Sequence, residues 1–94
     1  SAYYAAKGAI PTVTATFARE LAEINPQVRV NCIAPGPVMV PDSLSEEERA
    51  AIIRATVVKR LGTPQDVVQA TFALVENSFI TGSCLTLDGG RSIV

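Results

Sequence analysis

The chain has 94 residues, of which 48% are hydrophobic and 18% are charged, and its formal net charge is −1. This composition is typical of a globular domain and excludes a disordered chain. The eight Lys and Arg residues form no run or stripe, so we expect neither nucleic acid nor an anionic membrane as a main partner. No apolar stretch approaches the roughly 20 residues that a membrane-spanning helix needs.

A helix is predicted over residues 3–24. Apolar side chains recur there at helical spacing, and they are Ala5, Ala6, Ala9, Ile10, Val13, Phe17, Leu21 and Ile24. Pro11 lies inside this stretch and predicts a kink or a tolerated irregularity. Asn25-Pro26 ends the helix, because the residue before a proline is pushed out of the α region.

A strand is predicted next, over 28–34 (VRVNCIA), from its alternation and its β-branched content. Residues 35–41 (PGPVMVP) follow as a loop that is too rich in proline to pair as a central strand. Ser45 and Glu48 then form a capping box, S-x-x-E, which opens a helix over about 46–56.

A third helix start is predicted in residues 60–67 (RLGTPQDV). Thr63 is the expected N-cap, Pro64 the first helical residue and Asp66 an acidic residue of the first turn, and the helix continues to about Asn77. Residues 83–88 (SCLTLD) alternate as a strand that Gly89-Gly90 ends. This order predicts an α/β protein with crossover helices on a parallel sheet. Buried parallel strands need neighbours on both sides, so the two strands look like the end of a larger domain.

The residue types that remain for acid–base chemistry are few. The chain has no His, which removes Ser-His-Asp and Cys-His catalysis and most transition-metal sites from within it. We therefore expect no metal site, and proton transfer falls to Tyr, Lys, Asp, Glu or Cys. Cys32 and Cys84 stand far apart and form no C-x-x-C pair, so we expect two buried, reduced thiols and no disulfide.

Tyr3 and Lys7 are four residues apart, so a helix places them on one face. A free tyrosine titrates at about pH 10, and a nearby ammonium favours the phenolate and lowers that value. Such a tyrosine can exchange a proton with an alcohol or ketone oxygen near neutral pH. Taken alone, the Y-x-x-x-K spacing also fits an ordinary surface pair. Tyr4 is one position out of register and is expected to pack or to face the substrate side.

A rigid turn, Pro35-Gly36-Pro37, follows the first predicted strand. Its backbone can approach a flat ligand closely, at the carboxyl end of a strand, where open α/β sheets bind ligands.

Four ordered motifs together resemble the short-chain dehydrogenase/reductase family over nearly the whole chain. They are Tyr3-x-x-x-Lys7 with Gly8-Ala9, Asn31 with Pro35-Gly36, Arg60-x-Gly62-x-Pro64 with Asp66, and Ile80-Thr81-Gly82 through Asp88-Gly89-Gly90. The resemblance implies the C-terminal portion of a Rossmann-like, doubly wound parallel sheet, with about two strands and three helices present. Residues 1–94 are then the C-terminal part of a single NAD(P)-binding domain, and its N-terminal dinucleotide-binding half and the catalytic Ser are not in this chain.

The resemblance also implies site residues. Tyr3 is the expected general acid/base, and Lys7 is expected to hydrogen-bond the nicotinamide ribose and to lower the pKa of Tyr3. The stretch expected to support the nicotinamide consists of Pro35, Gly36, Pro37 and Val38. The cofactor is expected to be NADP or NAD, with NADP favoured. Val40 stands where the family often has Thr, so a hydroxyl contact to the cofactor amide is expected to be lost.

The remaining motif residues have structural roles in this interpretation. Asn31 is expected to be a brace and not a catalytic group. Arg60, Gly62 and Pro64 are expected to order the start of a helix, and the segment 88–90 to be structural and interfacial.

The resemblance implies an NAD(P)-dependent oxidoreductase that is active only at full length. Hydride would pass between nicotinamide and a carbonyl, an alcohol or a pterin-like C=N group of a small-molecule substrate. Segment 37–49, which matches the variable substrate lid, and the ending GGRSIV look most like the pteridine-reductase-like branch. The alternatives are a 3-oxoacyl carrier-protein reductase, a general alcohol dehydrogenase or a non-catalytic module of the same fold. We expect a cytoplasmic homotetramer, with a dimer as the fallback, in which the first helix packs on its symmetry mate. The alternative is that the apolar surface of this helix covers the other half of the same subunit, which must account for some of it.

Overall fold

The computed structural model describes residues 2–94, apart from the side chains of Tyr3 and Tyr4. The described residues form the helices α1 (Ala2–Ile24), α2 (Glu46–Arg54) and α3 (Pro64–Glu76), the strands β1 (Cys32–Pro35) and β2 (Cys84–Leu87), and a short 3₁₀ helix (Arg91–Ile93). The predicted order of elements and the α/β class are confirmed.

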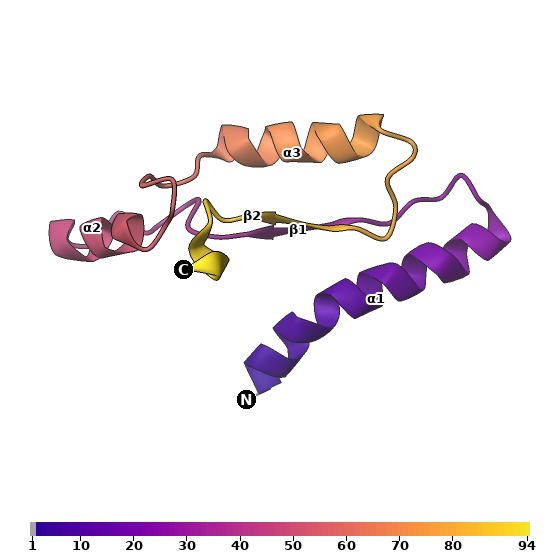
Figure 1. Cartoon of the computed structure of the whole chain (residues 1–94), viewed down its shortest axis with the longest axis horizontal. Coiled ribbons are helices and arrows are strands. Elements are labelled where there is room, and N and C mark those ends of the chain that lie inside the picture. The colour runs from indigo at the N-terminus through magenta and orange to yellow at the C-terminus, as the bar shows by residue number, and fades with distance from the viewer. Residues whose placement is uncertain (1) are drawn as a thin grey trace.

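β1 and β2 pair in parallel, and their register sets Cys32 opposite Cys84 and Pro35 opposite Leu87. Parallel strands need a long crossover connection, and α2 and α3 lie within it. α3 lies over one face of the sheet and α1 under the other (Figure 1). The arrangement is that of a portion of a Rossmann-like, doubly wound sheet, in which helices cover both faces.

α1 continues through Pro11 without a break. Small residues of this helix are buried, namely Thr14 and Ala18. The larger apolar side chains of the predicted stripe are not: Val13 is 47% exposed and Phe17 is 50% exposed. Because α1 packs under the sheet through small side chains, most of its apolar stripe is left uncovered.

Both ends of β1 differ from the predicted strand at 28–34. Val30 lies before β1 and makes irregular hydrogen bonds, its N–H donating to Thr81 Oγ1 at 3.2 Å and its carbonyl accepting from the Gly82 N–H at 2.7 Å. Pro35 is the last residue of β1 and not the first of a loop. Proline has no N–H, but no hydrogen bond between the strands is lost at this position. The bond to the Leu87 carbonyl is made by the N–H of the next residue, Gly36, at 2.9 Å.

Cys32 and Cys84 form a disulfide, so the prediction of two buried, reduced thiols is wrong. The register makes them directly opposite neighbours, with their Cα atoms 4.6 Å apart, inside the usual disulfide range of about 4.4 to 6.8 Å. Both residues are half-buried.

The helix starts predicted from capping residues are confirmed. Ser45 Oγ accepts from the Glu48 N–H at 3.1 Å, and the Glu48 carboxylate accepts from the Ser45 N–H at 3.0 Å. These hydrogen bonds, the one from the Ser45 backbone first, lower the pKa of Glu48. Thr63 caps α3 in the same way. α2 ends at Arg54, two residues before the predicted end.

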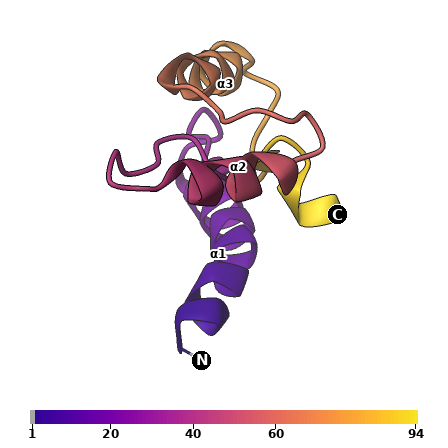
Figure 2. The same ribbon diagram turned by 90° about the vertical axis from the view of Figure 1, so that its left-hand side faces the viewer.

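The described chain is open and elongated, with extents of 51 × 33 × 23 Å and a radius of gyration of 15.8 Å. A compact domain of this length has a radius of gyration of roughly 12 Å. α1 projects away from the remaining elements in a view from the end (Figure 2). None of the helices within residues 2–94 is both long and apolar enough to cross a bilayer.

Candidate functional site

Three segments that are distant in sequence meet at the carboxyl ends of β1 and β2. They surround a pocket of about 260 Å³, at the edge of the sheet where open α/β proteins bind ligands. Its lining residues are Pro37 and Val38 after β1, Val58, Arg60, Gly62 and Asp66 around the start of α3, and Thr86, Leu87, Asp88, Gly89 and Gly90 at the end of β2. Two residues of the predicted cofactor-binding stretch, Pro37 and Val38, therefore line the pocket.

The other two residues of that stretch, Pro35 and Gly36, hold the loop against the neighbouring strand. A Cβ atom on Gly36 would lie 2.6 Å from Asp88 Cβ and 2.8 Å from Asp88 Cα, closer than real Cβ atoms approach. Glycine is therefore required here by the approach of one chain segment to another. The sequence suggested a different reason, the approach of a ligand.

Asp88 organises the turn that follows β2. Its carboxylate oxygens accept from the Gly90 N–H and from the Ser92 N–H, each at 2.9 Å. Hydrogen bonds from Ser92 and Gly90 lower the pKa of Asp88, with the Ser92 side chain the largest cause. Gly90 has a φ of 85°, in the left-handed region that favours glycine. The structural role predicted for segment 88–90 fits these contacts.

An ion pair forms part of the pocket wall at the start of α3. Arg60 Nη1 lies 2.9 Å from Asp66 Oδ2, and the same oxygen accepts from the Thr63 N–H at 2.8 Å. These contacts lower the pKa of Asp66 to about 2, with the Arg60 hydrogen bond the largest cause, and the pKa of Arg60 is raised in turn. Asp66 thus stays ionised at neutral pH and orders the helix start. The structural role predicted for Arg60 is confirmed.

Asn31 is a brace, as its motif predicted. Its amide nitrogen donates to the Ile80 carbonyl at 3.1 Å, and its amide oxygen accepts from the Ser83 N–H at 3.0 Å. Both atoms of the amide are used to fix the turn that leads into β2, so this side chain is not free to serve a substrate.

Arg29 has a comparable role that the sequence analysis missed. Its guanidinium donates to the carbonyls of Leu74 at 2.7 Å, Val75 at 2.8 Å and Ile80 at 2.9 Å. A cation near a helix C-terminus satisfies carbonyls that have no partner within the helix. A basic residue in an alternating strand pattern was the only available signal, and it does not reveal which helix end lies nearby.

Tyr3 and Lys7 both belong to α1, and their spacing places them on one face of that helix. The side chain of Tyr3 lies outside the described residues, so its approach to Lys7 stays a prediction. The first turns of α1 extend away from the sheet (Figures 1 and 2), and Lys7 is not one of the residues that line the pocket. The described residues bring Pro37 and Val38 of loop 35–38 to the pocket at the sheet edge.

The fold and the position of the pocket define an α/β protein of the Rossmann-like class. The family model described as "Enoyl-(Acyl carrier protein) reductase" matches residues 1–92. The chain belongs to the short-chain dehydrogenase/reductase family.

Known relatives cover nearly all of the chain. Dihydromonapterin reductase from Escherichia coli O6:K15:H31 is 35% identical over 92 residues, which are 98% of this chain and 37% of that protein. The 3-oxoacyl-(acyl-carrier-protein) reductase FabG of Thermotoga maritima is 36% identical over 95 residues, covering 97% of this chain and 38% of that protein. The structure of a 4-hydroxyisoleucine dehydrogenase complexed with NADH matches with a TM-score of 0.85 at 30% identity, over 99% of this chain and 40% of that one. The chain thus spans well under half the length of each of these relatives.

Proposed function

We propose that the full-length protein is an NAD(P)-dependent oxidoreductase. It passes hydride between a nicotinamide and a carbonyl, an alcohol or a pterin-like C=N group. The observation that carries this proposal is the family match over residues 1–92 together with an intact Tyr3-x-x-x-Lys7 motif in α1. Residues 1–94 are proposed as the C-terminal part of one NAD(P)-binding domain. The activity is proposed for the whole protein, and its proposed location is the cytoplasm.

Tyr3 is the proposed general acid/base. The bound nicotinamide supplies or accepts the hydride. In the reducing direction the Tyr3 hydroxyl gives its proton to the substrate oxygen or nitrogen, and in the oxidising direction the phenolate takes a proton back. The ammonium of Lys7, one helical turn along the same helix, favours the phenolate. These 94 residues contain no His, so no imidazole among them can act as the general acid/base in place of Tyr3.

The loop at 35–38 fits one side of a flat ring. Pro37 and Val38 give the pocket an apolar wall, and backbone hydrogen bonds hold the loop in place. The Gly36 N–H donates to Leu87, the Val38 N–H donates to Gly36 at 2.9 Å, and the Pro37 carbonyl accepts from Gly62 at 3.0 Å. A loop fixed at these points loses little entropy when a ligand binds. Pro35, Gly36, Pro37 and Val38 are therefore proposed to hold the nicotinamide, with Lys7 at its ribose.

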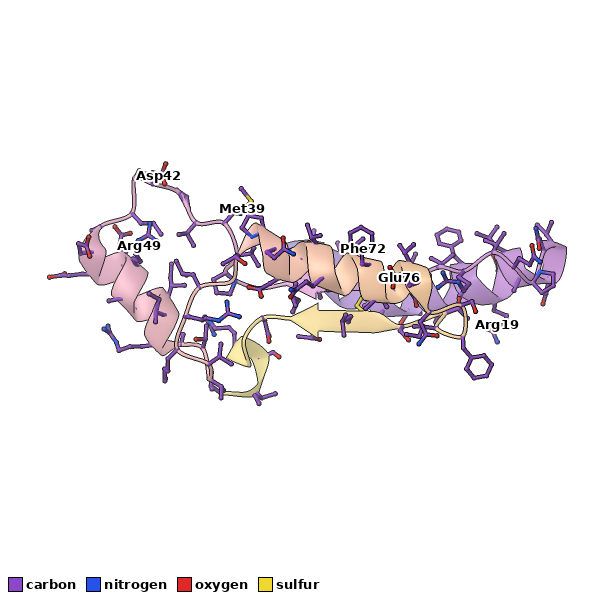
Figure 3. All side chains as sticks on the ribbon, turned by 90° about the horizontal axis from the view of Figure 1, so that it is seen from above. Arg19, Met39, Asp42, Arg49, Phe72 and Glu76 are labelled. Atoms are coloured by element: carbon purple, nitrogen blue, oxygen red, sulfur yellow. A yellow bond between two sulfur atoms is a disulfide. The ribbon has the colours of Figure 1, made fainter. Side chains whose placement is uncertain are left out.

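The substrate is proposed to be a reduced pterin or a carbonyl compound. A relative at 35% identity is named for dihydromonapterin, and one at 36% identity is named for 3-oxoacyl groups. Both substrate classes are therefore included in the assay below. The substrate side is proposed to be segment 37–49. Met39 is 81% exposed, and α2 lies beyond the carboxyl edge of the sheet (Figures 1 and 3).

A cofactor-oxidation assay on the full-length protein tests this function. NADPH and NADH are each offered with a dihydropterin, a 3-oxoacyl thioester and a simple ketone. We expect oxidation of at least one cofactor that depends on substrate, with the dihydropterin the fastest substrate. A faster rate with the thioester moves the assignment to the 3-oxoacyl alternative. Absence of any turnover, in a protein that still binds a nicotinamide cofactor, contradicts catalysis and supports a non-catalytic module.

Assembly into a homotetramer is proposed as well. The stripe along α1 leaves Ile10, Val13, Phe17 and Leu21 between 37% and 50% exposed. The other half of the proposed domain accounts for some of this area, and the rest is proposed as an interface, because exposed apolar patches mark interfaces. A helix face that meets its own symmetry copy forms an isologous contact.

A further inference from the structure

The two strands of the sheet are joined covalently at their first residues. Cys32 and Cys84 form a disulfide, and each begins its strand. Figure 3 shows the sulfur–sulfur bond in yellow beside β2. The proposed hydride chemistry makes no use of this bond, and nothing in the family match requires it.

At the far ends of the same strands, two chain segments of the pocket region pack closely against each other. Gly36 donates to the Leu87 carbonyl at 2.9 Å, and it lies so close to Asp88 that no Cβ fits. Such a contact depends on strand register, because a slip of one residue moves every side chain to the opposite face. The fit of loop 35–38 against turn 88–90 therefore requires the register that the disulfide fixes.

Within residues 2–94, hydrogen bonds of Asn31 and Gly36 hold the same register, and the disulfide adds a covalent link to them. β1 and β2 have four residues each, and a sheet of two short strands is marginally stable by itself. The disulfide spans a sequence separation of 52 residues, a loop that contains α2 and α3. Cross-links that close long loops restrict the unfolded chain most. Neither cysteine is fully buried within residues 2–94.

We propose that Cys32 and Cys84 are a reversible redox site that locks β1 against β2 and, through them, loop 35–38 against turn 88–90. The partner in the reaction is a dithiol. A thiolate of the dithiol attacks one Sγ and forms a mixed disulfide, which its second thiol resolves. The Sγ–Sγ bond breaks, the two cysteines together gain two electrons and two protons, and the dithiol becomes a disulfide. A disulfide oxidant reverses the step.

Peptide mapping of the full-length protein tests the bond itself. Trypsin cleaves after Arg29, Arg49, Arg60 and Arg91, so Cys32 falls in peptide 30–49 and Cys84 in peptide 61–91. The protein is treated with glutathione disulfide, alkylated and digested. We expect the two peptides to be linked, and dithiothreitol to separate them and to add one alkylation site to each. Unlinked, singly alkylated peptides after the oxidant overturn the proposal.

Hydrogen exchange on the protein treated with glutathione disulfide and on the protein treated with dithiothreitol tests whether the disulfide holds loop 35–38 against turn 88–90. Reduction is expected to cause a loss of protection at the Gly36 amide, with the amides of α2 as the internal reference. The double variant Cys32→Ser/Cys84→Ser is the control, and its exchange is expected not to respond to dithiothreitol. Equal protection of Gly36 in the linked and the reduced protein overturns the lock, whether or not the protein turns over a substrate.

Discussion

The Asp66 carboxylate accepts hydrogen bonds from Arg60 and from the Thr63 backbone, and its pKa falls from 3.8 to about 2. A group whose pKa is depressed by folding contributes stability above its unfolded pKa, and that contribution is lost as the pH falls through the folded value. The free energy of unfolding is therefore expected to fall as the pH drops through 3.8 toward 2.

The variant Asp66→Asn removes this contribution. We expect its free energy of unfolding, measured by urea titration of the full-length protein, to change less with pH in that window than the natural protein's does. Asp42→Asn, in the exposed loop before α2, is the control and should keep the natural slope. A slope for Asp66→Asn equal to the natural one would show that the Arg60 contact does not hold the carboxylate in solution.

Arg29 gives a second prediction at the scale of one residue. Arg29→Ala leaves the Leu74, Val75 and Ile80 carbonyls without the donor that they share. Hydrogen bonds to charged groups contribute roughly 1.5 to 3 kcal/mol where buried, and this group is partly exposed, so we expect a loss of about 1.5 kcal/mol. Chemical denaturation measures it, with Arg19→Ala on the exposed side of α1 as the control. Equal stabilities of the two variants would contradict the role.

Single residues were predicted well where a local motif fixes their partners. Arg60 was assigned a structural role at a helix start, and its partner Asp66 is six residues away. The brace role of Asn31 came from the family resemblance, because its partners Ile80 and Ser83 are 49 and 52 residues away. Arg29 and the cysteines were missed because their partners lie 45 to 52 residues away. Sequence spacing does not say which strands are neighbours.

Among the elements, loop 35–38 allows a direct test of its packing. Gly36→Ala places a Cβ 2.6 Å from Asp88 Cβ, so the loop or the turn must move. We expect a loss of stability and a weaker affinity for the nicotinamide cofactor, measured by denaturation and by cofactor fluorescence titration. Gly8→Ala is the matched control: nothing lies within 4 Å of its added Cβ, and it should stabilise α1 by about 0.5 to 1 kcal/mol. A Gly36→Ala variant as stable as Gly8→Ala would contradict this packing.

The helices were predicted more closely than the strands. Capping boxes are local, so Ser45 with Glu48 and Thr63 with Asp66 predicted both helix starts. Strand limits depend on a partner, and Val30 bonds to the turn at Thr81 and Gly82 in place of a regular ladder. The first strand was therefore predicted too long at its start.

For the whole molecule, the exposed stripe on α1 predicts assembly. Phe17→Glu places a charge within this stripe, where Phe17 is 50% exposed. We expect the full-length natural protein to be a tetramer and the variant to dissociate to smaller species, by light scattering. Glu20→Ala, exposed on the same helix, is the control and should remain assembled. A natural protein that is monomeric at micromolar concentration contradicts the assembly.

The α/β class and the family were predictable because four motifs occur in a fixed order along the chain. The pocket was not, since it exists only where the ends of β1 and β2 meet the start of α3. The position of Lys7 relative to that pocket depends on how α1 is oriented against the sheet, which the sequence does not give. In the described chain the N-terminal end of α1 extends away from the sheet (Figure 1).

The proposed chemistry depends most directly on the hydroxyl of Tyr3. The measurement is the turnover of full-length Tyr3→Phe, with cofactor affinity measured on the same sample and Tyr4→Phe as the matched control. General acid–base groups contribute about 100-fold to 10,000-fold in rate. We therefore predict that Tyr3→Phe loses at least about 100-fold in turnover while it keeps its cofactor affinity, and that Tyr4→Phe remains active. Turnover of Tyr3→Phe equal to that of the natural protein would contradict the account.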